Sequence, residues 1–213
     1  MLLNRSSGGG LRTSPRPRHQ PVVADKPERA AVCHNRRVDF VAELRAVHEF
    51  LDSHGFRSAV IGGVALAAYG HPRMTLDLDM VTESAAQDVL VAFMESRGFT
   101  TLHRSSGYSN HRHPERRHGR VDFMYVQGRT SELLFGALRH LPGPGGVRVA
   151  VPRPEHLIAM KVHAIRNDPR RRLRDLADIG FLLGRDDVDR ESARRYFEQA
   201  DLMEAWDELQ RSR

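Results

Sequence analysis

The sequence predicts an α+β domain, an α/β arrangement with a small mixed sheet, that carries a helical subdomain at its C-terminal end. Three observations lead to this prediction. Short apolar or alternating segments typical of strands occur between residues 57 and 151. Amphipathic segments with helical spacing lie among them. From residue 154 onward the pattern is helical throughout, which separates a mixed part from a helical part.

The first half of the body alternates between helices and strands. Apolar residues recur every three or four positions in the first segment, which predicts a helix that Gly55 ends. A short apolar run follows, typical of a buried strand, and the next strand alternates with Leu76, Leu78 and Met80 on one face. The predicted elements are a helix at 39–55, a strand at 57–62, a helix at 64–70, a strand at 75–81 and a helix at 84–97.

The second half contains three predicted strands and five predicted helices. A polar segment rich in His and Arg joins two strand candidates, and a glycine-rich turn precedes the last strand. The predicted elements are strands at 99–103, 120–126 and 147–151, and helices at 130–140, 154–166, 171–184 and twice within 190–212. These patterns divide the chain into an N-terminal tail at 1–38, a core at 39–151 and a helical subdomain at 152–213.

Composition limits the class of protein. Of the 213 residues, 40% are apolar and 28% are charged, as in soluble globular proteins. The single cysteine, Cys33, excludes an intramolecular disulfide framework and a cysteine-based zinc finger. The longest nearly apolar run, 59–70, is too short to span a bilayer, and the N-terminus lacks the apolar region of a secretory signal. We therefore expect a cytoplasmic protein without a membrane partner.

The net charge of +6 is confined to one end of the chain. Residues 1–38 hold eight Lys or Arg and two acids, whereas 39–213 hold 25 of each sign. The first segment is also rich in Gly, Ser and Pro, so it cannot bury enough apolar surface to fold and is expected to be disordered. The charge excess therefore indicates little about the partner of the folded part.

Two acidic residues and a glycine pair suggest a reaction. In a strand, Asp77 and Asp79 point the same way, so their carboxylates lie side by side. Such carboxylates repel each other unless they share a proton or a cation neutralises them, and Mg²⁺, with Mn²⁺ as the alternative, suits these oxygen ligands. Gly62 and Gly63 let backbone N–H groups approach a triphosphate closely. A phosphate-binding turn beside a divalent cation favours phosphoryl or nucleotidyl transfer.

Asp122 is the candidate third acid of this metal site. It lies in an apolar strand that can pair beside 75–81, where it would bind metal and help to activate the attacking hydroxyl. Each feature alone also fits an ordinary structural role, as an exposed edge strand, a plain turn or a solvated aspartate. The order of strand, glycine pair, helix and paired acids favours the site.

The run AVIGGVALAAYGHPRMTLDLDMV (59–81) resembles the motif of DNA polymerase β-like nucleotidyltransferases. The resemblance implies that fold for the core, an NTP substrate and transfer of an NMP. The Arg-x-Thr-x-Asp-x-Asp sequence is similar to the AbiEii branch, which includes the MenT toxins, and implies nucleotide binding by Gly62, Gly63, Arg73 and Thr75. Gly63 departs from the Gly-Ser of many members, so a serine hydroxyl contact is missing.

The C-terminal half resembles the same branch. The segments PEHLIAMK and RDLADI are similar to its paired helical motifs, in which the lysine and the first aspartate serve the nucleotide site. This implies such roles for Lys161, the one lysine outside the tail, and for Asp175. Asp178 can take the same role. The alternatives are an exposed helix position for the lysine and ion pairs with nearby arginines for both aspartates.

Two basic segments bear on the acceptor. Residues 103–120 and 166–174 each hold five arginines and one acid, which suits an RNA phosphate backbone if both flank the acidic site. A solvated loop and helix end are the alternatives. His111, His113 and His118 fit no standard zinc spacing, and no cysteine is near, so a zinc site is not expected.

Residues and resemblance together favour one function. This is metal-dependent transfer of an NMP from an NTP to an RNA 3′ end, expected to be the acceptor end of tRNA, by the toxin of a toxin–antitoxin pair with its cognate antitoxin protein as a partner. One alternative is the same chemistry on a small molecule such as an aminoglycoside, which the arginines would repel. The other is a non-catalytic nucleotide-binding module.

Overall fold

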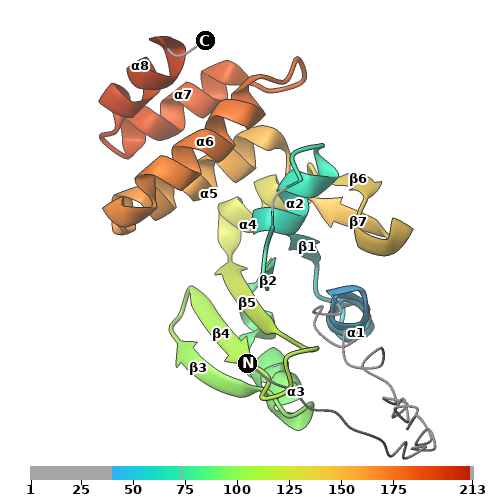
Figure 1. Cartoon of the computed structure of the whole chain (residues 1–213). Helices are drawn as coiled ribbons and strands as arrows, with labels where there is room; N and C mark the ends of the chain where they lie inside the picture. The colour runs from blue at the N-terminus through green and yellow to red at the C-terminus, as the bar shows by residue number, and fades with distance from the viewer. Residues whose placement is uncertain (1–39, 73, 212–213) are drawn as a thin grey trace, which may run out of the picture. The chain divides into compact units, whose positions relative to one another are not determined.

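The computed structural model describes residues 40–72 and 74–211. The predicted tail at 1–38 and Arg73 lie outside the described residues. The helices are α1 (Phe40–Ser53), α2 (Gly62–Ala68), α3 (Gln87–Ser96), α4 (Gly128–Phe135), α5 (Pro154–Asn167), α6 (Arg172–Leu183), α7 (Arg190–Gln199) and α8 (Met203–Arg211), with short 3₁₀ turns η1 (Ser84–Ala86), η2 (Pro144–Gly146) and η3 (Pro169–Arg171) (Figure 1). The strands are β1 (Ser58–Val60), β2 (Asp77–Glu83), β3 (Thr100–Arg104), β4 (Tyr108–Arg112), β5 (Arg120–Val126), β6 (Arg139–Pro142) and β7 (Arg148–Val151).

Five strands form one mixed sheet in the order β1-β2-β5-β4-β3. Strands β2 and β5 at its centre are parallel, whereas the other three neighbouring pairs are antiparallel. Strands β6 and β7 form a separate antiparallel hairpin. This sheet with its surrounding helices confirms the predicted mixed α/β fold class.

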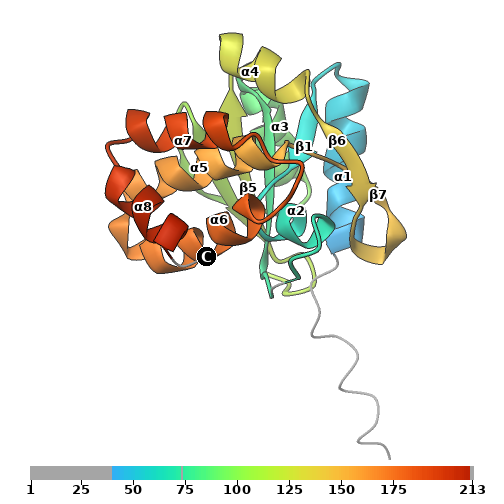
Figure 2. The ribbon, with the colours of Figure 1, turned by 90° about the horizontal axis from the view of Figure 1, so that it is seen from above.

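One apolar core fixes the helical end of the chain against the sheet. Leu78 of β2 and Phe123 of β5 are each 1% exposed, and they share this core with Ile158 of α5 and Ile179 of α6, which are fully buried. Figures 1 and 2 both show α5–α8 gathered on one side of the strands and α1 on the other. Because α5 and β2 are packed into the same core, side chains from the helices and from the strands can line one site.

Strand β2 begins two residues later than predicted. Its pairing with β5 starts at Asp77, opposite Arg120. Leu78 and Met80 are buried, but Leu76, which was predicted to share their face of the strand, precedes the strand and is 69% exposed, so that part of the prediction was wrong. The two acids therefore lie at the very start of the strand.

Strand β4 was not predicted, because its buried side chains are polar. Ser109 and His111 are both fully buried, and the Ser109 hydroxyl lies 2.6 Å from Tyr125 Oη and 2.8 Å from His111 Nε2. These hydrogen bonds satisfy groups that would otherwise be costly to bury. A pattern of hydrophobicity alone therefore interprets the segment as a loop.

The helix predicted at 130–140 is shorter. Helix α4 ends before Gly136, and the chain then forms β6, which pairs with β7 across the predicted glycine-rich turn. The helices predicted after residue 154 are confirmed as α5–α8. In the part of the chain that the structure describes, no helix has the length and apolar character needed to cross a membrane.

Candidate active site

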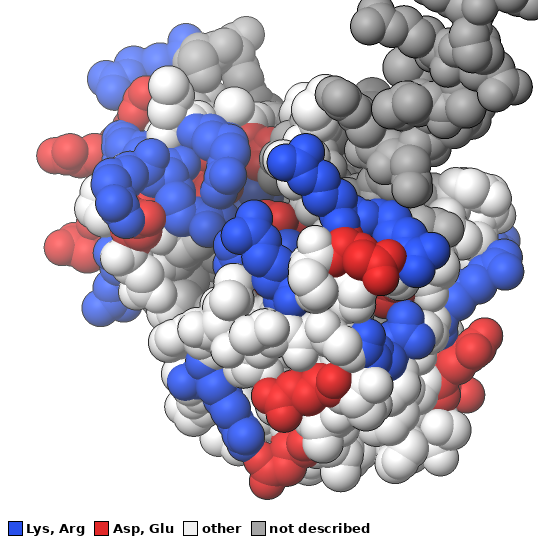
Figure 3. All heavy atoms as spheres, turned by 60° about the horizontal axis from the view of Figure 1, so that its bottom comes forward, with Lys and Arg blue, Asp and Glu red and all other residues white. Residues whose placement is uncertain are grey.

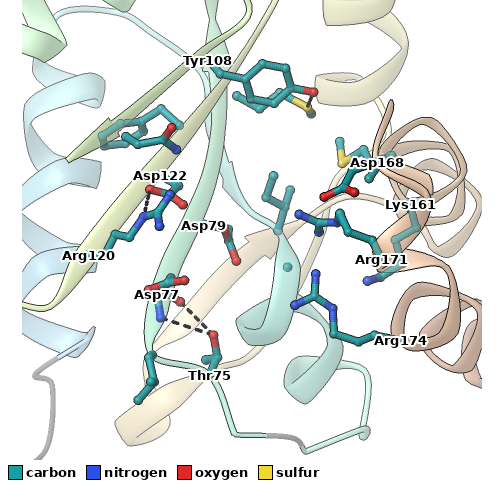
Figure 4. A pocket seen from close by; sticks show the side chains of 18 of the residues that line it. Thr75, Asp77, Asp79, Tyr108, Arg120, Asp122, Lys161, Asp168, Arg171 and Arg174 are labelled. Atoms are coloured by element: carbon teal, nitrogen blue, oxygen red, sulfur yellow. Dashed lines mark hydrogen bonds and ion pairs between the residues drawn. The ribbon is translucent and has the colours of Figure 1, made fainter. Parts of the chain in front are cut away.

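The pairing of β2 with β5 brings three carboxylates to one face of the sheet. Asp79 lies directly opposite Asp122 in this parallel pair, and Asp77 lies two residues before Asp79 on the same side. All three line one pocket of about 700 Å³, a volume within the usual range for small-molecule sites. Figure 4 shows the three side chains on the strand side of this pocket.

Gly62 makes room for the carboxylate of Asp79. The backbone N–H of Ile61 donates to the Asp79 carbonyl at 2.9 Å, which holds the start of α2 against β2. At this point Gly62 has a φ of +58°, and a Cβ atom here would lie 2.0 Å from Asp79 Oδ2. Only glycine fits both the backbone conformation and this close approach.

Gly63 and Thr75 are in similarly close contact. A Cβ atom on Gly63 would lie 2.7 Å from Thr75 Cβ, so the threonine side chain fills the space that a side chain at 63 would need. The Thr75 hydroxyl donates to the Asp77 carbonyl at 3.0 Å and lines the pocket. Gly63 itself is buried. Thr75 therefore fixes the backbone just before the acids.

The charges near Asp77 disfavour its ionised form. Burial raises the pKa of the Asp77 carboxyl, and the neighbouring Asp122 raises it further against the opposing effect of Arg120. Asp122 also has a cationic partner, because Arg120 Nε donates to its Oδ1 at 2.8 Å, and this hydrogen bond raises the pKa of Arg120. An all-oxygen donor set in which carboxylates destabilise one another fits a divalent ion such as Mg²⁺.

Cations line the opposite side of the pocket. Lys161 of α5 lies there with Arg171 of η3 and Arg174 of α6, and Asp168 accompanies them (Figure 4). The Asp168 carboxylate is bound by Arg170 at 2.8 Å. The pocket therefore has an acidic strand side and a basic helix side.

Lys161 is held by two buried aspartates. Its Nζ donates to Asp175 Oδ1 at 3.1 Å and to Asp178 Oδ2 at 2.5 Å, and the two acids are 0% and 2% exposed. Burial alone would raise the pKa of Asp175, but Lys161 and Arg171 outweigh it and lower that pKa. Since an ammonium group has three N–H donors, one remains for a ligand in the pocket.

The structure thus brings together most of the residues that the sequence singled out. Gly62, Thr75, Asp77, Asp79, Asp122 and Lys161 line the pocket. Asp175 and Asp178 do not line the pocket. They are buried and form ion pairs with Lys161, so they contact the lysine. Arg73 lies outside the described residues.

Other residues at the pocket were missed. Arg120 had been counted only within a basic segment, and its contact with Asp122 follows from two-residue spacing along one strand face. Tyr108 and Asn110 line the pocket from β4, which was interpreted as a loop. Arg171 and Arg174 belong to the basic segment that was expected to flank the acidic site, with ion pairs to the helix aspartates as the alternative; they line the pocket and also lie 2.9 Å and 3.6 Å from Asp175.

Solved structures share the fold. The solution structure of an antibiotic-resistance factor, ANT(2'')-Ia, is similar to this chain with 14% identity and a TM-score of 0.56, and the match covers 81% of this chain and 95% of that one. The same enzyme in complex with adenylyl-2''-tobramycin matches over 76% and 96%, with 14% identity and a TM-score of 0.55. The lincosamide adenylyltransferase LnuA, with lincomycin bound, matches over 70% and 99%, with 11% identity and a TM-score of 0.50.

Sequence comparison identifies the family. No match was found among curated protein sequences. A family model described as "Uncharacterised nucleotidyltransferase" matches residues 19–208, which is most of the chain and includes every residue of the pocket. The acidic strand side and the basic helix side of the pocket are consistent with this match. The chain therefore belongs to this nucleotidyltransferase family and is an enzyme of that class.

Proposed function

We propose that this nucleotidyltransferase moves an NMP from an NTP to a 3′ hydroxyl of RNA, with the acceptor end of tRNA as the expected acceptor. The observation that carries the proposal is the division of the pocket. Asp77, Asp79 and Asp122 lie on the strand side, whereas cations lie on the helix side. This arrangement suits a metal-bound triphosphate.

The residues of the pocket divide the work of the reaction. The acceptor oxygen forms a bond to the α-phosphorus, the bond from that phosphorus to the β-phosphate oxygen breaks, and pyrophosphate leaves. The acceptor proton passes to the carboxylate of Asp122. A Mg²⁺ ion held by Asp77, Asp79 and Asp122 would neutralise charge on the triphosphate and favour ionisation of the hydroxyl. The remaining N–H of Lys161, with Arg171 and Arg174, binds phosphate oxygens.

An RNA acceptor is favoured by charge beyond the pocket. Six arginines of the two basic segments are exposed and lie outside the pocket: Arg104, Arg112, Arg116, Arg117, Arg166 and Arg170. Figure 3 shows a face on which Lys and Arg side chains gather in several groups with fewer acids among them. Arginines spaced in this way bind several phosphates of a polynucleotide without reading its sequence.

The test of the activity is label transfer. The full chain is incubated with tRNA and each α-labelled NTP in Mg²⁺, and label on the 3′ end is measured. We expect transfer from at least one NTP and a loss of at least a hundredfold in Asp79→Asn. Asp88→Asn is the matched control, because Asp88 lies on α3 with its side chain 86% exposed. Absence of transfer to any RNA would contradict the proposal.

The toxin role is a separate part of the proposal. It rests on the resemblance of the Arg-x-Thr-x-Asp-x-Asp run to the AbiEii branch. Expression of the wild-type protein should stop growth, whereas Asp79→Asn should not, and co-expression of the neighbouring upstream gene should restore growth. Unimpaired growth of cells that contain active enzyme would rule out this role.

A small-molecule acceptor is the second candidate. One solved protein that shares this fold is called an antibiotic-resistance factor, and another is called a lincosamide antibiotic adenylyltransferase. The match covers nearly the whole length of both proteins. The same assay with tobramycin and lincomycin as acceptors distinguishes the candidates. Transfer to an antibiotic but not to RNA would replace the first proposal with this one. We expect the reverse, because a cationic antibiotic would meet the arginines of the helix side.

A further inference from the structure

We propose that His113, Glu115 and His118 form a second metal site, which takes a transition-metal ion such as Zn²⁺. The three residues lie in the connection from β4 to β5, and one ligand atom from each lies within 4.8 Å of the others. They are not among the residues that line the active-site pocket. The proposed site is therefore distinct from the three aspartates.

The donor set determines the kind of ion. Two imidazole nitrogens and one carboxylate oxygen are ligands that Zn²⁺ accepts, with a fourth position left for water. Mg²⁺ prefers oxygen ligands throughout, so it should favour the aspartates of the pocket instead. The two imidazole rings already lie near each other, with centroids 4.2 Å apart. Little rearrangement is needed to bring their nitrogens to one ion.

A buried carboxylate orients His118. Its Nδ1 lies 2.6 Å from Glu43 Oε1, and Glu43 is 1% exposed and is also bound by Arg97 at 2.8 Å. A carboxylate held in this way accepts a hydrogen bond from Nδ1–H, and the neutral ring then has its lone pair on Nε2. Metal-binding histidines are commonly supported by such a second carboxylate, which fixes the ring and strengthens the ligand.

A cationic side chain lies between two of the ligands. Arg117 Nε donates to His118 Nε2 at 3.1 Å and lies 2.8 Å from Glu115 Oε2. It therefore contacts the same two acceptors that a metal ion would use. Its side chain is 57% exposed, so it can turn into solvent when an ion binds. His113 Nδ1 accepts the Glu115 backbone N–H at 3.0 Å, and this bond is also lost if Nδ1 is the ligand.

The proposed ligand set differs from the three histidines considered from the sequence, because His111 cannot take part. His111 is fully buried, with its Nε2 2.8 Å from the Ser109 hydroxyl and its Nδ1 3.2 Å from the Thr101 hydroxyl. Burial lowers its pKa to about 4. It is part of the sheet core and cannot join its neighbours at the surface. Glu115 supplies the third ligand instead, through a turn that the linear spacing does not reveal.

The test is Zn²⁺ binding by the untagged full chain, measured by calorimetry in millimolar Mg²⁺ so that the aspartates are occupied. We expect one Zn²⁺ per chain and at least tenfold weaker binding in His113→Asn, His118→Gln and Glu115→Gln. Because His118→Gln also loses a contact to Glu43, Glu115→Gln, at an exposed position, is the variant least expected to disturb folding. His140→Gln, at another exposed histidine, should bind like wild type.

The competing arginine provides a sharper test. Arg117→Ala should tighten Zn²⁺ binding about threefold or more, since no guanidinium then competes for His118 and Glu115. Arg116→Ala, at the exposed neighbouring position, should leave the affinity unchanged. Absence of Zn²⁺ binding in wild type, or equal binding in wild type and Glu115→Gln, would overturn the proposal. Co²⁺ in place of Zn²⁺ should give an absorption band in wild type that is lost in His113→Asn.

Discussion

Replacement of Gly62 by alanine should have two effects, a clash of the new Cβ atom with Asp79 and the backbone strain of a non-glycine residue at a positive φ. A matched control can separate the first effect from the second. The new Cβ atom would lie 2.0 Å from Asp79 Oδ2 and 2.9 Å from Asp79 Cβ. Restoring an ordinary contact of 3.4 Å requires the carboxylate to move by about 1.4 Å. Because Asp79 Cβ is fixed to strand β2, rotation of the side chain alone cannot relieve the contact, and the start of the strand must shift as well.

The expected size of the effect follows from two separate costs. A non-glycine residue with a positive φ costs about 1–2 kcal/mol, which lowers the free energy of unfolding. A displacement of about 1 Å at a reacting group costs about a hundredfold in rate. We therefore expect Gly62→Ala to reduce kcat/KM for NMP transfer by at least about a hundredfold, and to lower stability by more than the backbone cost alone.

Gly128 provides the matched control. It is the first residue of α4, as Gly62 is of α2, and its φ of +56° is nearly the same, but nothing lies within 4 Å of its added Cβ atom. Gly128→Ala should lose about 1–2 kcal/mol in urea unfolding and keep transfer within about threefold of wild type. Equal transfer by both variants would refute the reasoning, because the contact with Asp79 would then have no consequence.

Three further predictions concern the buried charges. Asp77→Asn should abolish transfer but leave the thermal midpoint of unfolding at pH 7 at or above that of wild type. The raised pKa of Asp77 means that its ionised form opposes folding, and the variant removes that ionised form. A lower midpoint would contradict this. Lys161→Met should cost up to about 3–5 kcal/mol in urea unfolding, because it removes the ammonium group that two buried carboxylates share, although Asp175 keeps its contacts with Arg171 and Arg174. Adding Asp178→Asn should recover part of the loss. The lowered pKa of Asp175 means that its contribution to stability is present at neutral pH and is lost as the pH falls below the unfolded value of about 3.9. Urea midpoints from pH 7 to pH 3 should therefore fall less steeply for Asp175→Asn than for wild type, and equal slopes would exclude this contribution.

The sequence is sufficient to predict those parts of the fold that depend on local pattern. Alternation places Leu78 and Met80 in the core and Asp77 and Asp79 on the opposite face, because strand geometry has a period of two. The glycine pair likewise marks a close approach of backbone and side chain, which the structure shows at Asp79. Patterns of this kind need no knowledge of which segments meet in space.

Other parts of the site depend on long-range pairing, which one sequence does not reveal. Strand β4 has buried Ser109 and His111 where a pattern search expects apolar residues, and hydrogen bonds to each other, to Tyr125 and to Thr101 satisfy these polar groups. The side-by-side position of Asp79 and Asp122 depends on the register of two strands more than 40 residues apart in sequence. The arginines of η3 and α6 reach the pocket only because α5 packs against the sheet.

The two groups of buried or half-buried aspartates lead to different conclusions, although their residue types are the same. Asp175 and Asp178 surround an internal cation, and the pKa of Asp175 is lowered, so this group is already neutralised within the chain. The pKa of Asp77 is raised despite the nearby Arg120, so the surroundings of Asp77 disfavour its negative charge. A folded protein tolerates such imbalance where a bound cation relieves it. This contrast favours the strand acids as the metal ligands and gives the helix acids the task of positioning Lys161.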